Sequence, residues 1–393
     1  MEVHFVDASW AGDTPPFELL QIREYAMADR TFDAKRRQFL GTTAFALSGA
    51  VVASSALVGA TSASAQSTAA KGPAVVNYPN EKGVTIERVT YPARNMGTNI
   101  VANLFKPANF DSSRKYAAIV VTHPFGAVKE QSSGLYAQRL AEAGFIGLAY
   151  DASYQGESGG EPRLMEVPGQ RVDDISCAID FLVQHPQVDP ARIGSLGICI
   201  GGSYALNHAQ HEHRVRAVAA VSTFDIGEGR REGLSGSISY EERIKRLKDA
   251  GEQRSREARG EPVRLVPVVA NSPADFTAAT PVMYREGYEY YRTARGQHPN
   301  SVNRYVFSSL PQQMAFYPFE MIETISPRPL LVIAGSKAET KFWSDRVYEK
   351  AKEPKQLFVV DGATHVDLYD KPQFVGPAVS KLAEFFGQHL ASA

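Results

Sequence analysis

From about residue 75 onward, short apolar runs alternate with longer amphipathic runs along the chain. The run Ala117–Thr122 is almost wholly apolar and rich in β-branched residues, which is typical of a strand buried on both faces. Comparable runs predict strands at 84–89, 100–105, 117–122, 145–150, 193–196, 217–221, 330–334 and 357–360. Helical periodicity predicts helices at 135–143, 172–184, 203–209, 343–352 and 376–390. This alternation predicts an α/β fold, in which a mostly parallel sheet carries helices on both faces.

The block between about 225 and 325 interrupts the alternation. It is charged and helix-like, and it contains many aromatic residues, such as the pair Tyr290 and Tyr291. So many aromatic side chains need a surface to pack on, which argues against a disordered loop. We therefore predict a helical cap at 225–325, inserted into a core formed by 75–224 and 326–393.

The first 65 residues have the pattern of an export signal. The basic stretch Lys35-Arg36-Arg37 precedes an apolar, small-residue run from Gly41 to Ala60, and Ala63-Ser64-Ala65 fits a cleavage site. Paired arginines before Gln-Phe-Leu resemble the twin-arginine signal, and Met27 is a candidate start that would give an ordinary n-region. Thr, Ser and Gly interrupt the apolar run, so cleavage is favoured over anchoring. We expect a periplasmic or secreted protein with no stable membrane association after cleavage.

Composition excludes several classes of function. An apolar fraction of 44 % is ordinary for a globular protein, and 42 basic residues balance 43 acidic ones, so no nucleic-acid surface is indicated. The two cysteines, Cys177 and Cys199, are too few for a disulfide framework or a four-cysteine zinc site. The histidines at 208, 211 and 213 are interpreted as an exposed helix end, and we predict no metal and no cofactor.

The informative motif is Gly197-Ile198-Cys199-Ile200-Gly201-Gly202. It follows a predicted strand and opens a predicted helix, which is the context of a nucleophile elbow. The elbow is a sharp turn that lifts a nucleophile above the sheet, and here the nucleophile is Cys199. Cys177 lies inside a predicted helix without such a turn, so we interpret it as a small packed side chain.

A nucleophilic cysteine needs a base, an orienting acid and an oxyanion hole. His365 follows the last predicted strand and is the candidate base. The segment after strand 330–334 supplies the candidate acid, Glu339, with Asp225 as a serious rival and Asp345 as a weaker one. The order cysteine, acid, histidine is the order expected in α/β hydrolases.

Two main-chain N–H groups are expected to stabilise the oxyanion. One belongs to Ile200, the residue after the nucleophile. The other belongs to the loop after strand 117–122, where Pro124 has no N–H, so that Phe125 is the natural donor.

Four segments carry a resemblance to a known family. HPFGAVKEQ (123–131), YDASYQGESGGEPR (150–163), RIGSLGICIGG (192–202) and GATHVDLYD (362–370) resemble the dienelactone-hydrolase-like branch of the α/β hydrolases. The resemblance implies an eight-stranded α/β-hydrolase sheet and a Cys–His–acid triad that acts on carboxylic esters, lactones or thioesters. Dienelactone hydrolases proper lack an insertion of this size, and they carry a glutamate where this chain has His123.

Together these features predict a hydrolase that forms an acyl-enzyme on Cys199. The predicted substrate is a small acyl or ester compound, contacted by His123 and by Tyr291 of the cap. An acyl or polyketide transferase would share the same triad, and a peptidase of the same fold stays open. A non-catalytic binding protein is disfavoured because the Cys–His pair is intact. The sequence does not address the oligomeric state.

Overall fold

The structure is a computed structural model that describes residues 78–80 and 82–392, so the predicted export signal at 1–65 lies outside the described residues. Its centre is an eight-stranded sheet with the order β1-β2-β4-β3-β5-β6-β9-β10. The pairs β1–β2 and β2–β4 are antiparallel, and all other neighbours are parallel. The strands are β1 Thr85–Ala93, β2 Thr98–Lys106, β3 Tyr116–Thr122, β4 Ile146–Tyr150, β5 Val188–Ile198, β6 Val215–Val221, β9 Leu330–Gly335 and β10 Lys355–Val360.

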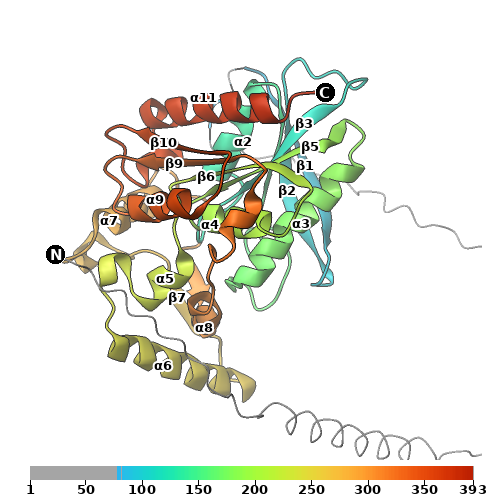
Figure 1. The fold of residues 1–393 in the computed structure, drawn as a ribbon. Helices are drawn as coiled ribbons and strands as arrows, with labels where there is room; N and C mark the ends of the chain where they lie inside the picture. The colour runs from blue at the N-terminus through green and yellow to red at the C-terminus, as the bar shows by residue number, and fades with distance from the viewer. Residues whose placement is uncertain (1–77, 81, 393) are drawn as a thin grey trace, which may run out of the picture. The chain divides into compact units, whose positions relative to one another are not determined.

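Helices cover both faces of this sheet (Figure 1). The long helices of the core are α2 Ser132–Glu142, α3 Pro168–Gln184, α4 Ile200–Ala209, α9 Lys341–Lys350 and α11 Pro372–His389, and the short α10 spans Asp367–Asp370. Helices α2 and α11 pack together on one face, whereas α3 and α4 pack together on the other face beside α9. The mostly parallel α/β architecture predicted from the hydrophobic pattern is therefore confirmed.

The segment between β6 and β9 lies where the sequence predicted a helical cap, and it is called the cap below. Its helices are α5 Ile226–Arg231, α6 Tyr240–Ala258, α7 Val282–Arg292 and α8 Leu310–Met314, with short 3-10 turns at Leu234–Gly236, Pro273–Asp275, Phe307–Ser309 and Ile322–Ile325. The cap also holds a two-stranded antiparallel sheet, β7 Leu265–Pro267 and β8 Arg304–Val306, which the sequence pattern did not predict. Each strand has only three residues, too few to show an alternating pattern.

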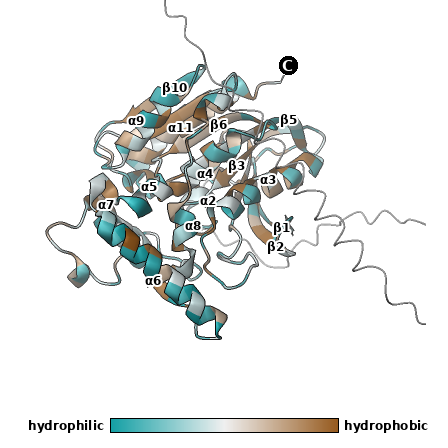
Figure 2. Ribbon diagram, turned by 60° about the horizontal axis from the view of Figure 1, so that its bottom comes forward, coloured by the Kyte–Doolittle hydropathy of each residue, from teal (hydrophilic) through white to brown (hydrophobic). Residues whose placement is uncertain are grey.

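The hydrophobic core lies between the sheet and its helices. Ile119, Val120 and Val121 of β3 are fully buried, as expected for a strand covered on both faces. Figure 2 shows the hydrophobic colour concentrated in the sheet, whereas α6 at the edge of the cap is mostly hydrophilic. Within the described part of the chain, no helix is both long and apolar enough to cross a bilayer.

A buried charge cluster joins the loops that follow β3 and β4. The ammonium group of Lys129 is 2.6 Å from Glu130, 2.9 Å from Asp151 and 2.5 Å from Glu157. Asp151 also accepts hydrogen bonds from the main-chain N–H groups of Lys129 and Glu157, each at 2.8 Å. Because Lys129 is fully buried, these carboxylates are needed to compensate for the loss of hydration of its charge.

Candidate active site

Cys199 occupies the turn between β5 and α4. Its backbone has φ 59° and ψ −122°, a left-handed conformation that is strained for any residue with a Cβ. The turn is tight because a Cβ on Gly197 would overlap the main-chain oxygen of Gly201, and a Cβ on Gly201 would overlap that of Thr122. The backbone therefore has the sharp strand-to-helix geometry that the glycine spacing predicted.

The thiol of Cys199 faces the two predicted oxyanion donors. The main-chain N–H groups of Ile200 and Phe125 and the hydroxyl of Tyr369 lie close enough to the sulfur to act on the pKa of the thiol. Burial raises the pKa of the thiol to about 11, although these three neighbouring groups act in the opposite direction. The side chain is only 8 % exposed, so at neutral pH it is a protonated thiol in a nearly dry site.

His365 follows β10, and both of its ring nitrogens have partners. Nδ1 is 2.6 Å from Oγ1 of Thr340, and Nε2 is 3.2 Å from the hydroxyl of Tyr369. The Ser222 hydroxyl donates to the His365 carbonyl oxygen at 3.0 Å, which fixes the loop. Burial lowers the pKa of the imidazole to about 3, so the ring is neutral.

The sequence analysis expected Glu339 to orient His365, but the structure places its side chain elsewhere. The Glu339 carboxylate is exposed and accepts a 2.8 Å hydrogen bond from the main-chain N–H of Met283, at the start of α7. Its neighbour Thr340 is the residue that reaches Nδ1. Adjacent residues of the loop after β9 point in different directions, and spacing alone does not decide which one turns inward.

The two rival acids also lie elsewhere. Asp225 caps α5 by accepting a 2.9 Å hydrogen bond from the N–H of Glu228, and burial raises the pKa of its carboxyl to about 6. Asp345 forms an ion pair with Lys341 at 2.6 Å. No carboxylate of the described residues hydrogen bonds to His365, whose partner at Nδ1 is a neutral hydroxyl.

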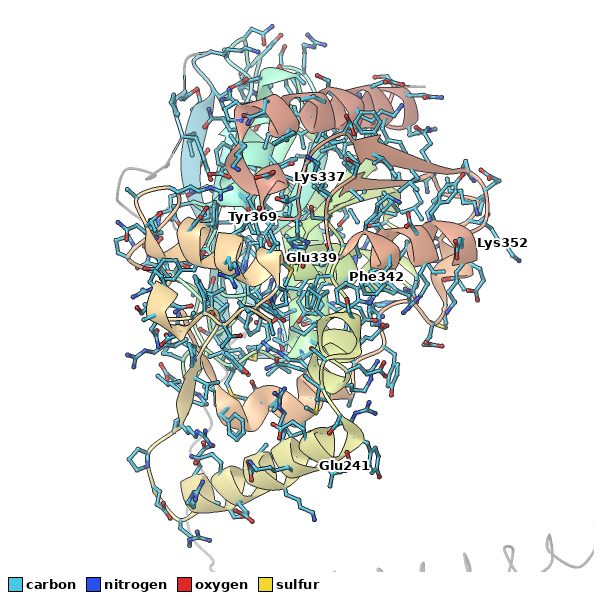
Figure 3. The ribbon with its side chains drawn as sticks, turned by 90° about the vertical axis from the view of Figure 1, so that its left-hand side faces the viewer. Glu241, Lys337, Glu339, Phe342, Lys352 and Tyr369 are labelled. Carbon is cyan, nitrogen blue, oxygen red and sulfur yellow. The ribbon has the colours of Figure 1, made fainter. Side chains whose placement is uncertain are left out.

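Tyr369 is a site residue that the sequence analysis missed. Its hydroxyl is 3.2 Å from His365 Nε2, and it lies close to the Cys199 thiol and to Tyr291 of the cap. Figure 3 labels Tyr369 and Glu339, which come from the segments after β10 and β9 and lie beside α7. A signal existed, because Tyr369 follows His365 by four residues, which is about one helical turn.

A cavity of about 80 Å³ lies between the elbow and the cap. Cys199, His365 and Tyr369 form part of its wall, and α5 and α7 supply much of the remainder. The lining residues are Phe125, Cys199, Ile200, Phe224, Ile226, Gly229, Arg230, Val268, Val269, Met283, Tyr284, Gly287, Tyr291, His365, Val366 and Tyr369. The surface offered to a ligand is therefore mainly apolar, with a few polar groups near the thiol.

Of the two predicted substrate contacts, Tyr291 lines this cavity and His123 does not. His123 is fully buried, its Nδ1 donates to the Pro124 carbonyl oxygen at 2.7 Å, and its Nε2 accepts from the N–H of Ala152 at 3.1 Å. Burial, with the nearby Arg171 charge, holds the pKa of His123 well below its usual value. His123 therefore has a structural role here, joining the loops after β3 and β4.

Cys177 and the histidines at 208, 211 and 213 do not form a second catalytic or metal site among the described residues. Cys177 is buried in α3, and its sulfur accepts from the Arg94 N–H at 3.4 Å. His208 is buried and its Nε2 contacts the hydroxyl of Ser176 at 3.0 Å, so the predicted exposed helix end is wrong for this residue. The described residues contain no group of three or more His, Cys, Asp or Glu arranged to hold a metal ion.

The sheet order, the elbow after β5 and the histidine after the last strand define an α/β hydrolase. A model of the dienelactone hydrolase family matches residues 100–226. The crystal structure of the hypothetical protein PA2218 from Pseudomonas aeruginosa is similar with a TM-score of 0.74 and 37 % identity, covering 80 % of this chain and 96 % of that one. This chain belongs to the dienelactone hydrolase family of the α/β hydrolases, which confirms the resemblance seen in the sequence.

Two fungal enzymes are more distant relatives. The polyketide transferase claH of Penicillium crustosum is 26 % identical over 75 % of this chain and 94 % of that protein. The thiohydrolase aneE of Aspergillus aculeatus is 26 % identical over 66 % of this chain and 81 % of that protein. Family membership and these relatives support an enzyme with a hydrolytic or acyl-transfer role on a small-molecule substrate.

Proposed function

We propose that this protein hydrolyses carboxylic esters, lactones or thioesters by way of an acyl-enzyme on Cys199. The observation that carries the proposal is the setting of the thiol. It sits on a strained elbow, lies beside the N–H groups of Ile200 and Phe125, and shares an apolar cavity with His365. A carbonyl oxygen that takes up those two N–H groups would be stabilised as negative charge develops on it.

In this proposal Tyr369 carries the proton between the thiol and the base. With Nδ1–H donated to Thr340, the lone pair on Nε2 accepts from the Tyr369 hydroxyl. As the sulfur bonds to the acyl carbon, the Cys199 proton passes to the tyrosine oxygen and the tyrosine proton passes to Nε2. The imidazolium then returns a proton to the leaving oxygen or sulfur, and the bond from that atom to the acyl carbon breaks.

The pKa values support transfer of the proton during attack rather than before it. A thiol with a pKa of about 11 beside an imidazole with a pKa of about 3 does not form a resting ion pair. Thr340 gives the imidazolium a neutral hydroxyl where a carboxylate would stabilise its charge more strongly. The acyl-enzyme therefore forms only when a carbonyl is positioned against the sulfur.

The acceptor in the second step decides between hydrolysis and transfer. Water yields a hydrolase, whereas an alcohol, thiol or amine yields an acyltransferase on the same residues. The apolar lining of the cavity favours an organic acceptor once the acyl group is bound, so transfer is the second candidate. Product analysis with and without an alcohol acceptor separates the two reactions.

The test of the nucleophile is acylation measured by intact mass with a panel of 4-nitrophenyl esters. We expect the wild-type protein and the Cys177→Ala control to gain one acyl group and to release nitrophenol, and Cys199→Ala to do neither. Peptide mapping of the acylated protein should locate the adduct on Cys199. Full esterase activity in Cys199→Ala, with normal thermal unfolding, would overturn the proposal.

The test of the relay uses Tyr369→Phe with Tyr291→Phe as its control. Both tyrosines line the cavity, but only Tyr369 contacts the reacting groups. We expect Tyr369→Phe to slow acylation by about 100-fold with little change in KM, within the range for loss of general acid–base assistance. We expect Tyr291→Phe to stay within about threefold of wild type, since among the described residues its hydroxyl makes no hydrogen bond to His365. Equal acylation rates in Tyr369→Phe and the wild type would exclude the relay.

We further propose that the protein is exported by the twin-arginine route and acts outside the cytoplasm. The support is the basic stretch at 35–37, the apolar run and the Ala-Ser-Ala site. N-terminal sequencing of the exported protein should find a mature end close to residue 66. A mature chain that begins before Lys35 would refute this.

A further inference from the structure

Arg230 gives the cavity an unbalanced positive charge. It lies on α5, directly before Arg231, and it is the one Lys, Arg, Asp or Glu among the described residues that line the cavity. The other titratable groups of the wall are neutral, because the pKa of the Cys199 thiol is raised and that of His365 is lowered. The cavity therefore carries a cation with no anion facing it from its own wall.

The surrounding side chains hold the Arg230 guanidinium but do not neutralise it. Its central carbon lies 4.8 Å from the ring centroid of Phe125 and 4.9 Å from that of Tyr305. Nε donates to the amide oxygen of Gln313 at 2.9 Å. Within the described part of the chain, no hydrogen bond reaches its Nη1 or Nη2, and no carboxylate forms an ion pair with it.

Nearby charged residues of α5 are, in contrast, satisfied within the fold. Arg231 donates to the main-chain oxygens of Met314 and Phe316. Glu228 pairs with Arg346. Arg230 thus differs from its neighbours because its Nη1 and Nη2 atoms have no hydrogen-bond acceptor among the described residues.

The chemistry of guanidinium identifies the missing partner. Stacking between two rings leaves the edge of the planar group free, and its parallel N–H bonds match the two oxygens of a carboxylate. A half-buried cation in an apolar wall loses hydration, and an anionic ligand that enters compensates for that loss. Because Arg230 stacks on Phe125, whose N–H is an oxyanion donor, the cation stands close to the place of the reacting carbonyl.

We propose that Arg230 binds a free carboxylate on the acyl part of the substrate, so that the natural substrates are half-esters or half-thioesters of dicarboxylic acids. This inference rests on the proposed function, since it assigns a subsite within the same cavity. It adds the substrate class, which neither the triad residues nor the relatives specify.

The experiment compares mono(4-nitrophenyl) adipate with 4-nitrophenyl hexanoate, which differ only in the terminal carboxylate. The variants are Arg230→Gln and, as a matched loss of one positive charge outside the cavity, Lys337→Gln, whose side chain is exposed. We expect the wild type to prefer the adipate half-ester. We expect Arg230→Gln to lower kcat/KM for the half-ester by about 10- to 100-fold, mainly through KM, as for loss of a charged hydrogen bond. Hexanoate turnover should change by less than about threefold in Arg230→Gln, and Lys337→Gln should keep the wild-type preference.

Two outcomes would overturn the inference. One is a wild-type protein that shows no preference for the half-ester. The other is an Arg230→Gln variant that loses activity equally on both substrates, because then the arginine only packs the cap. In either case, hydrolysis of the hexanoate ester that depends on Cys199 would still support the proposed function. If neither ester acylated Cys199, the proposed function itself would be wrong.

Discussion

Replacing Thr340 by Val removes one oxygen atom from beside His365 with almost no change in shape. Oγ1 of Thr340 and Nδ1 of His365 are 2.6 Å apart, and both side chains are almost completely buried. In Thr340→Val the Nδ1–H group has no partner within the described residues, and water has little access to replace the hydroxyl. The substitution therefore isolates one hydrogen bond that orients the proposed base.

The size of the effect follows from this geometry. A buried donor that loses its partner costs about 1–3 kcal/mol, so the free energy of unfolding should fall by that amount. The same hydrogen bond holds the tautomer in which Nε2 is free to accept a proton. Losing about 1–3 kcal/mol of preference lowers the ratio of that tautomer to the other by about 5- to 150-fold, and kcat/KM should fall by at most that factor.

The assay pairs urea unfolding with kcat/KM for a 4-nitrophenyl ester, and Glu339→Gln is the control. A glutamine at 339 keeps a carbonyl oxygen to accept from the Met283 N–H, so both quantities should stay close to wild type. A loss of activity in Glu339→Gln would refute the reasoning. If Glu339→Gln lost as much activity as Thr340→Val while unfolding normally, the carboxylate would be acting on His365 after all.

Three further predictions concern pH and stability. Burial lowers the pKa of His365 to about 3, so the imidazole stays neutral and kcat/KM should not decline between about pH 8 and pH 5. An inflection near pH 6.5 in the profile of kcat/KM against pH would contradict this. Gly197→Ala should abolish the elbow and with it esterase activity, because its Cβ overlaps a carbonyl oxygen. Gly376→Ala, at an exposed position of α11 where a Cβ meets nothing, should melt at or slightly above the wild-type temperature. Lys129→Met leaves several carboxylates facing one another in a buried site and should lower the free energy of unfolding in urea by about 3–5 kcal/mol. Lys245→Met breaks an exposed ion pair and should lower it by at most about 1 kcal/mol. Equal losses of stability would mean that burial of the cluster does not matter.

Much of the fold was predictable because its determinants are local. Runs such as Ala117–Thr122 can only be placed in a doubly covered sheet, and β3 occupies Tyr116–Thr122 as that pattern required. The elbow was predictable for a similar reason. The tight turn excludes side chains at Gly197 and Gly201, so the spacing of these glycines indicates the turn directly.

The partners of the candidate base were not predictable in the same way. Thr340 and Glu339 are adjacent in sequence, and the one that reaches His365 is set by the direction of the loop after β9. Tyr369 was missed because its proximity to the thiol joins residues that are far apart in the sequence. His123 has the residue type of a substrate ligand, but its burial depends on the loop after β4, which covers it.

The sequence by itself determined the layered α/β architecture and the position of the thiol at the end of β5, because hydrophobic period and glycine sterics act over a few neighbouring residues. The tertiary structure alone decided that a neutral hydroxyl faces Nδ1 of His365, that a tyrosine stands between sulfur and imidazole, and that an arginine of the cap enters the cavity. These features depend on how segments distant in the chain meet at the edge of the sheet. Burial, which sets the pKa values of Cys199 and His365, is a property of that assembly and of no single segment.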